Sequence, residues 1–600
     1  MQSRQWRNSM LLHEHSIVEK VFLQSIQATI ANKFTRAAGV AVDGVVVGMF
    51  LGVESLAAYG LAWPLAMIYA LPGSTLSGGT RNLYSKYLGQ GETETAANVF
   101  TLGLLLSAGC SLALAAITFI FLEPLGVLLG ASGENAGLLL LVCQYLLGLI
   151  IGLPFDNMAK YIAGFLGMDS NYRLVVTGMT VATVTNIAGD IIVVALLGGD
   201  MFMLGLTTSI SRMMYFAAIG THFLRKERML RFNLTGITGV REKIAVIFAN
   251  STPAVCDRIF SSLGAVISNC ILSAASGGIY LAAYSVHKSL TSFIGSLYYG
   301  IGDTVWTLAS VYNGEEDKKA LDELQKVTLK IGMGIAIGAA VLLWLFSPGI
   351  ADIYMDIDDT KTFGLTIEAI QMFALSVPLY LLFFSFVNYT AGIGRLKAAN
   401  NFYFMANFGA IVPVIWVMVN IFGGRGAWLA TPVIQLLILA GAAGYIYFHR
   451  SGDRYSAKRL LLPPDFGTAL GKELTITADS MLEVMGMSRI VTLFCQENGI
   501  SRKRAGALAH CIEELGVNII EHGFNDGRPH AIDVRILAKE NEIILRIRDD
   551  CRPFNPLNYY QIYGHDGNWE KNIGLRMVIN MTKSIKYVST MGTNNLIIKI

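Results

Sequence analysis

The tetrapeptide Leu56-Ala57-Ala58-Tyr59 recurs as Leu281-Ala282-Ala283-Tyr284, 225 residues further along the chain. A second match at the same offset supports this register, because both copies have a helix end that leads into a turn of glycine and an acidic residue. The matched positions are Ser85, Tyr87, Gly89 and Glu92 in the first copy and Ser310, Tyr312, Gly314 and Asp317 in the second. Two matches at one offset indicate an internal repeat, a common feature of membrane transporters.

The composition assigns most of the chain to a membrane. Of its 600 residues, 53% are hydrophobic and only 15% are charged, whereas soluble domains carry about 25% charged residues. After about Arg450 the sequence becomes polar and its apolar runs become short, which predicts a separate soluble domain. The net charge of +3 gives no reason to expect nucleic-acid binding.

About twelve apolar stretches are long enough to cross roughly 30 Å of hydrocarbon. They lie near 31–52, 56–79, 97–121, 138–156, 174–197, 201–223, 252–275, 281–301, 327–346, 366–388, 399–422 and 427–448. The expected organisation is a cytoplasmic segment 1–30, a first lobe 31–223, a basic cytoplasmic loop 224–250, a second lobe 251–448, a linker 449–470 and a domain 471–600. Six crossings per copy make the repeats parallel. The sequence therefore predicts a polytopic all-α membrane protein of two six-helix lobes, with the substrate path between them.

The distribution of positive charge predicts the orientation. Most Lys and Arg residues before position 451 fall in segments on one side of the membrane, whereas Lys361 and Arg425 fall on the other. The densest basic block lies in the central loop and comprises Arg225, Lys226, Arg228, Arg231, Arg241 and Lys243. Because Lys and Arg gather on the cytoplasmic side, we expect a multi-pass protein of the plasma membrane with both termini in the cytoplasm. The first thirty residues lack the apolar core of a cleavable signal peptide.

The membrane half resembles the multidrug and toxin extrusion (MATE) transporters over roughly residues 20–450. The stretches that carry the resemblance are Asp43 to Gly52, Ala57-Ala58-Tyr59-Gly60 to Pro64, Gly78-Gly79, and Ser85 through Leu88-Gly89-Gln90-Gly91-Glu92 to Ala97. The resemblance implies a V-shaped pair of lobes that alternates access. It also implies export of small organic, often cationic, substrates against a sodium or proton gradient.

Ionisable residues inside the predicted spans are candidates for ion coupling, since a carboxylate there costs on the order of 3 kcal/mol. Asn186 and Asp190 share one helix face because they are four residues apart. The MATE resemblance implies that they form a cation site with Asp43, and Thr207 or Thr208 could add a hydroxyl ligand. Packing between helices would explain the same residues without any ion, and the sequence does not decide between Na⁺ and H⁺.

Further charges occupy the second lobe. They are Asp257 and Arg258 on the seventh span and His287 and Lys288 on the eighth. These residues either line the pathway or neutralise one another within the fold. The seven cysteines lack metal-binding spacing, so no metal site is expected from them.

The C-terminal 130 residues predict an α+β domain that begins after Pro463-Pro464. Expected strands lie at 474–477, 530–537, 543–548, 585–590 and 595–600, and expected helices at 480–496, 501–521 and 573–582. Glu514 and Asn518 point the same way because they are four apart on one helix. A carboxylate beside an amide suits a Mg-nucleotide site. Gly574 opens a further helix, whose N-terminus favours phosphate.

In order and spacing, these motifs resemble the GHKL ATPases, and among them most the anti-sigma-factor serine kinases. The resemblance implies that Asn518 holds Mg²⁺, that Glu514 is the catalytic general base, that Asp549 binds the adenine of ATP, and that 557–573 form the ATP lid. Two glycines of the family pattern are replaced, by Cys551 and Asn572. These departures favour ATP binding over efficient phosphotransfer.

The sequence thus predicts an exporter coupled to a Na⁺ or H⁺ gradient, with a regulatory ATP-binding domain. The alternative is a membrane receptor that uses a transporter-like body as sensor and the ATP domain as a serine/threonine kinase acting on a protein partner. The segment 467–473 has neither the spacing nor the Ser/Thr of a Walker A loop, which disfavours pumping driven by ATP.

Overall fold

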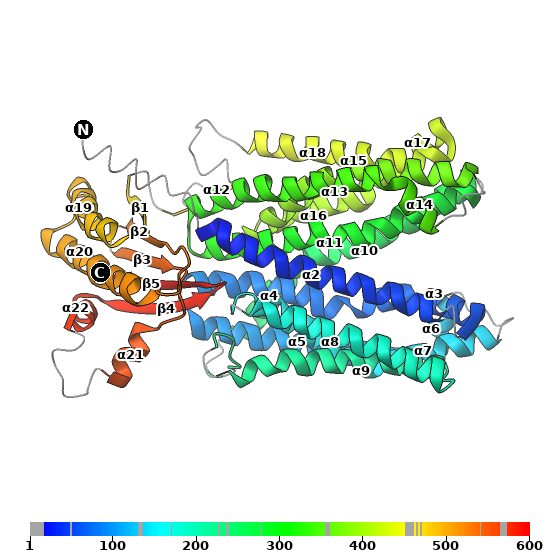
Figure 1. The fold of residues 1–600 in the computed structure, drawn as a ribbon, viewed down its shortest axis with the longest axis horizontal. Helices are drawn as coiled ribbons and strands as arrows, with labels where there is room; N and C mark the ends of the chain where they lie inside the picture. The colour runs from blue at the N-terminus through cyan, green and yellow to red at the C-terminus, as the bar shows by residue number, and fades with distance from the viewer. Residues whose placement is uncertain are drawn as a thin grey trace.

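Figure 1 shows a computed structural model in which a helical body carries a mixed α/β domain at one end. The structure describes residues 17–47, 51–129, 136–169, 171–225, 228–233, 235, 239–275, 278–354, 360–449, 461–463, 466–467, 471–539, 542–563 and 573–600.

The first lobe consists of helices that overlap its predicted spans. Its elements are α2 (Ile17–Val46), α3 (Gly52–Tyr69), α4 (Leu71–Gly89), α5 (Thr93–Ile120), α6 (Leu122–Leu128), α7 (Ala136–Leu166), α8 (Tyr172–Asp190), the π-helical turn η2 (Ile191–Leu196), α9 (Met201–Gly220) and the 3₁₀ turn η3 (Thr221–Leu224). Large apolar side chains on the outside of this lobe are exposed, as at Leu112 (59%) and Phe119 (67%). In water such surface would be unfavourable, whereas lipid accommodates it.

The second lobe has the same general plan. Its elements are α10 (Val240–Ala275), α11 (Gly278–Gly314), α12 (Lys318–Val327), η4 (Thr328–Gly332), α13 (Met333–Leu345), α14 (Ser347–Tyr354), α15 (Thr360–Gly392), α16 (Leu396–Phe404), η5 (Met405–Gly409), α17 (Ile411–Phe422), η6 (Gly423–Arg425) and α18 (Gly426–Phe448). Across the described residues of both lobes, seven helical stretches are long and apolar enough to span a membrane. Among the described helices, α2 and α11 are not counted in these seven, and they pack against each other across the two lobes.

The helix of the first predicted span begins earlier than expected. We expected it over 31–52, after a segment without an apolar core, but α2 already runs from Ile17. Its first turns contain the polar residues Glu19, Lys20 and Gln24. Because a membrane span is predicted from a continuous apolar pattern, these turns are not predicted as part of one. Val18, Val21 and Phe22 in these turns are buried. The start of α2 packs against protein, not lipid.

The two lobes touch in the half of the bundle nearest the α/β domain. Thr29 Oγ1 donates to the carbonyl oxygen of Gly300 at 3.1 Å, and Lys33 Nζ lies 2.7 Å from Asp303 Oδ2. Asn82 Nδ2 donates to the Ala391 carbonyl at 2.9 Å. Each of these pairs joins a first-lobe helix to a second-lobe helix. The lobes are therefore closed against each other at this end.

The C-terminal domain is an antiparallel sheet with helices on one face. Its strands are β1 (Glu473–Ala478), β2 (Ile532–Ala538), β3 (Ile543–Asp549), β4 (Ser584–Thr590) and β5 (Thr593–Lys599), in the order β1-β2-β3-β5-β4. Its helices are α19 (Met481–Glu497), α20 (Arg502–Gly523), α21 (Pro556–Tyr563) and α22 (Ile573–Met581). The predicted strands and helices are confirmed to within two residues, apart from α21, which falls within the stretch expected to form the lid.

Side chains alternate between the two faces of this sheet, as a period of two requires. Val534 and Ile536 on β2, with Leu545 and Ile547 on β3, join the core beneath α19 and α20. Every residue of β3 is nonetheless buried. The second face of the sheet is therefore covered as well, and the ends of the transmembrane helices cover it (Figure 1).

Candidate functional site

The predicted nucleotide residues begin on α20, an amphipathic helix. Leu508, Ile512 and Leu515 turn into the core of the domain, which leaves Glu514 and Asn518 together on another face. Asn518 Nδ2 donates to Glu514 Oε1 at 3.2 Å. The amide nitrogen is used in this bond, so the amide oxygen of Asn518 is the atom suited to a hard cation such as Mg²⁺.

Gly574 lies directly against this pair. A Cβ atom at residue 574 would come within 1.8 Å of the Glu514 carboxylate, so any side chain there would force Glu514 to move. Because Gly574 has no side chain, the first turn of α22 can pack directly against the Glu514 carboxylate. A helix N-terminus beside these residues is a suitable place for phosphate, and the donor set fits a Mg-nucleotide.

Asp549 ends β3 and is 5% exposed. Its Oδ1 accepts hydrogen bonds from the backbone N–H of Cys551 at 3.0 Å and from Asn594 Nδ2 at 2.7 Å. Burial raises the pKa of Asp549 to about 6, and the bonds from Asn594 and Cys551 oppose this rise only in part. The carboxylate is thus fixed in position and poorly hydrated.

ATP affinity should weaken as the pH falls through about 6. The proposed hydrogen bond from the amino group of adenine is stronger to an ionised carboxylate than to a neutral carboxyl group, so protonation of Asp549 should weaken it. Calorimetric titration of the full chain with Mg-ATP at several pH values measures the effect. In Asp549→Asn, affinity should follow only the titration of the ATP phosphates. Identical pH profiles for the two proteins would contradict a role for Asp549 in binding adenine.

Cys551 replaces a glycine of the family pattern, and the structure shows how it is accommodated. A Cβ on Gly523, at the end of α20, would lie 2.7 Å from Cys551 Sγ. The thiol therefore lies in space that a glycine leaves on the neighbouring helix. Residues 564–572 of the expected lid, which include Asn572, lie outside the described residues.

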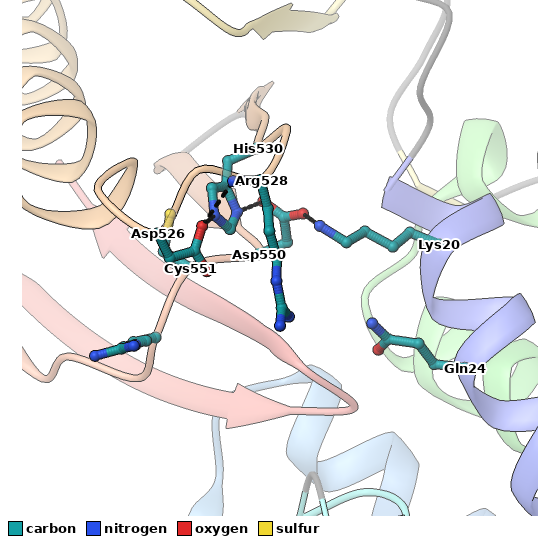
Figure 2. Close-up of a pocket in the computed structure, with 8 residues that line it drawn as sticks. Lys20, Gln24, Asp526, Arg528, His530, Asp550 and Cys551 are labelled. Carbon is teal, nitrogen blue, oxygen red and sulfur yellow. Dashed lines mark hydrogen bonds and ion pairs between the residues drawn. The ribbon is translucent and has the colours of Figure 1, made fainter.

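A polar cluster that the sequence did not predict connects the loop after β3 to α2 (Figure 2). Lys20 Nζ forms an ion pair with Asp550, and Asp550 Oδ1 lies 3.0 Å from His530 Nδ1. His530 Nε2 lies 2.7 Å from Asp526 Oδ1. These groups line a cavity of about 380 Å³. The ligand atoms of His530, Asp550 and Cys551 are close enough together to hold a metal ion. In this structure, however, Asp550 is paired with the Lys20 ammonium.

In the membrane half, Asp190 is fully buried. It accepts a hydrogen bond from Asn186 Nδ2 at 2.8 Å and another from the Thr207 hydroxyl. The regular helix α8 ends at Asp190 and passes into the π-helical turn η2. Such π-turns occur frequently at functional sites. The structure thus groups Asn186, Asp190 and Thr207 from α8 and α9.

The remaining predicted coupling residues are placed differently. Thr208 donates to the carbonyl oxygen of Leu204 at 3.2 Å, so Thr207 provides the hydroxyl beside Asp190. Asp43 lies on α2, which packs against α8, and its side chain lies outside the described residues.

The four charges of the second lobe have different neighbours. Asp257 Oδ1 accepts a hydrogen bond from Asn407 Nδ2 at 3.1 Å. His287 is held between the Ala369 carbonyl and the Thr431 hydroxyl, at 3.1 and 3.2 Å. The Lys288 ammonium lies over the Tyr284 ring, 5.1 Å from its centroid. Polar partners thus surround Asp257 and His287 within the fold. Whether these residues and Arg258 also line the pathway stays a prediction.

The fold and these sites define a class of protein, namely an integral membrane transporter joined to a nucleotide-binding domain. The chain belongs to the MatE family, whose model matches residues 29–192 and 253–417. The model of the histidine kinase-like ATPase domain matches residues 477–600. Both family resemblances drawn from the sequence are thus confirmed, and the C-terminal domain implies ATP binding.

Several known proteins are similar to the membrane half. Multidrug export protein MepA of Staphylococcus aureus (strain MSSA476) is 21% identical over 409 residues, which cover 67% of this chain and 88% of the relative. MepA of Staphylococcus haemolyticus (strain JCSC1435) is 23% identical over 381 residues, covering 63% and 82%.

Among solved structures, the Vibrio cholerae MATE transporter VcmN in the bent form matches with a TM-score of 0.65 at 17% identity, covering 71% of this chain and 95% of that one. A multidrug resistance MATE family transporter in an outward-facing conformation gives a TM-score of 0.65 at 19% identity, with the same coverage. These likenesses establish the MATE fold.

Proposed function

We propose that this protein is an antiporter that exports organic, cationic compounds in exchange for Na⁺ or H⁺, and that its ATP domain regulates the exchange. The relatives named multidrug export proteins support drug-like organic substrates. An organic cation could be drawn to a pathway that contains buried carboxylates. The gradient, and not ATP, is the energy source in this proposal.

The observation that carries ion coupling is the environment of Asp190. A fully buried carboxylate, held by Asn186 and Thr207 at the change from α-helix to π-helix, is costly to keep in a membrane protein. Binding of Na⁺ or of a proton offsets that cost. If Asp43 of α2 joins these residues, as the family resemblance implies, the ion site has the carboxylate, amide and hydroxyl oxygens that a small cation prefers.

In the ATP domain, we infer that Asn518 holds Mg²⁺, that Glu514 acts as general base, and that Asp549 binds adenine while Gly574 gives access to the phosphates. Bound ATP would supply a phosphoryl group for transfer to a water or to a serine or threonine hydroxyl of a protein partner. Glu514 would accept the proton of the attacking group. Because Cys551 replaces a glycine of the family pattern, ATP binding is better supported than phosphoryl transfer.

For topology, we propose a multi-pass protein of the plasma membrane with both termini in the cytoplasm. The proposed division is 1–30, 31–223, 224–250, 251–448, 449–470 and 471–600, with α2 beginning inside the first segment. The excess of Lys and Arg on the side that carries the ATP domain supports this orientation.

Reconstituted vesicles test the transport proposal. The full chain is placed in vesicles loaded with ethidium, and an inward Na⁺ or H⁺ gradient is imposed separately. One gradient should accelerate ethidium exchange, and an ionophore for that ion should abolish the effect. Absence of transport with either ion, together with kinase activity that responds to an added ligand, would instead support the receptor reading.

A further inference from the structure

The second face of the ATP-domain sheet presents three buried arginines to the transporter. Arg535 on β2 lies opposite Arg546 on β3, and Arg548 follows two residues later on the same face. They are 4%, 8% and 7% exposed. Guanidinium groups that are removed from water require partners, since burial of an unpaired charge is very costly. Within the domain, Arg535 Nε donates to Glu473 Oε1 of β1 at 2.7 Å. The other partners described below come from the ends of transmembrane helices.

One set of partners lies on the second lobe, at the turn between α11 and α12. Arg535 donates to the backbone carbonyls of Glu315 at 2.9 Å and of Glu316 at 2.6 Å. Arg548 forms an ion pair with the Glu315 carboxylate, which is 3% exposed. At the edge of this contact, Lys539 Nζ lies 3.0 Å from Glu316 Oε2. The sheet thus holds the acidic turn by charge and by backbone bonds together.

The other set of partners lies on the first lobe. Arg546 Nη2 donates to the Gly89 carbonyl, at the end of α4, at 2.8 Å. The β4–β5 turn reaches the end of α7, where the Thr590 hydroxyl and the Met591 N–H donate to the Met168 carbonyl at 2.7 and 2.9 Å. Lys20 of α2 adds the ion pair with Asp550 (Figure 2). One rigid sheet therefore contacts both lobes.

These contacts lie over the place where the lobes meet. A Cβ on Gly89 would come within 2.9 Å of the backbone of Gly314 and Glu315, and a Cβ on Gly314 within 2.7 Å of the Lys86 carbonyl oxygen. Gly89 and Gly314 are equivalent positions of the internal repeat. The two repeated turns thus touch backbone to backbone, and the sheet covers both.

Alternating access between parallel repeats is largely rocking of one lobe against the other. A substrate can enter from the domain side only if the lobe ends there separate. We propose that the docked ATP domain is an autoinhibitory clamp, which joins both lobes through Arg535, Arg546 and Arg548 and holds this end of the pathway closed. The proposal rests on the proposed transport function and specifies its regulation.

The nucleotide residues are connected to the clamp through adjacent positions. Asn594 donates to Asp549, and Arg548 Nε donates to Asn595 Oδ1 at 3.1 Å. Asp550, which holds Lys20, follows Asp549 directly. Arg548, Asp549 and Asp550 are consecutive at the end of β3. A ligand that shifts Asp549 therefore also shifts Arg548 and Asp550, which contact the transporter. Because coupling of binding equilibria is reciprocal, nucleotide affinity and docking affect each other.

Reversible crosslinking of the full chain tests the clamp. Lys539→Cys with Glu316→Cys ties the domain to the second lobe, and Lys20→Cys with Asp550→Cys ties it to the first. A short bis-methanethiosulfonate reagent bridges each pair, and reductant removes the bridge. With both ties, gradient-driven ethidium exchange in vesicles should fall at least about tenfold and recover on reduction. The native chain treated with the same reagent is the control.

A single tie distinguishes clamping from general damage. With only the 539–316 tie the domain can move with one lobe, so exchange should stay well above that of the doubly tied protein. Full exchange in the doubly tied protein, with bridges verified by mass spectrometry, would overturn the clamp while leaving the transport function intact. Loss of exchange before crosslinking in the cysteine variants, despite normal exchange in the native chain, would also count against a clamp, because release should free transport. If the native chain shows no gradient-driven exchange, the transport function itself fails.

Discussion

Asp190→Asn should abolish gradient-driven export. Asparagine keeps the size and much of the hydrogen bonding of aspartate toward Asn186 and Thr207, but it cannot bind a proton or supply a negative ligand to Na⁺. A loss of about 3 kcal/mol in ion binding corresponds to roughly a 100-fold weaker interaction. We therefore expect the initial rate of ethidium exchange in vesicles to fall at least about 100-fold.

Asp200→Asn is the matched control for this substitution. Asp200 is exposed and accepts a hydrogen bond from the Met203 N–H at the start of α9, at 3.0 Å. Asparagine serves that N-cap equally well, so exchange should remain near the native rate. Asp43→Asn tests the proposed partner on α2. Native exchange rates in both Asp43→Asn and Asp190→Asn would refute ion coupling at this site.

Asn518→Ala should remove most Mg-ATP binding and leave gradient-driven exchange measurable. The amide oxygen of Asn518 is the proposed Mg²⁺ ligand, and alanine also leaves Glu514 without its bond from Asn518. Loss of a ligand to a divalent cation, at about 3 kcal/mol, predicts roughly 100-fold weaker Mg-ATP binding by calorimetry. Transport should persist, because the gradient supplies the energy.

Asn525→Ala provides the comparison in the same domain. Asn525 follows α20, is exposed, and donates only to the Glu521 carbonyl at 2.8 Å among its described contacts. Its removal should change ATP affinity by less than about twofold, since exposed bonds of this kind contribute little. Equal loss of affinity in both variants would indicate that the substitutions destabilise the domain and do not act at a nucleotide site.

Local sequence patterns predicted the repeat, the α/β domain and the pair Glu514 and Asn518, because helix spacing alone places such residues together. The period of two in β2 and β3 likewise shows which residues face the core. The same alternation puts Arg546 and Arg548 on the other face, and arginines there are typical of a solvated surface. Their burial depends on contacts hundreds of residues away, with Gly89 and Glu315.

The start of α2 was missed for a related reason. Lys20 interrupts the apolar pattern that marks a membrane span, and its partner Asp550 lies 530 residues further along the chain. In the sequence, the acidic turn at Glu315 indicates only the internal repeat. Its role in docking required knowing that the sheet lies over both repeated turns. Contacts between domains leave no periodic signal in either partner, so sequence reasoning does not reach them.

In the proposed mechanism, a gradient drives transport while ATP regulates it. The most direct measurement is the initial rate of ethidium exchange by the full chain in vesicles, with and without the coupling-ion gradient and with and without Mg-ATP on the domain side. We predict that exchange requires the gradient in every case and that Mg-ATP changes its rate only when the gradient is present. Concentrative transport that requires Mg-ATP and survives collapse of the gradient by ionophores would contradict the account.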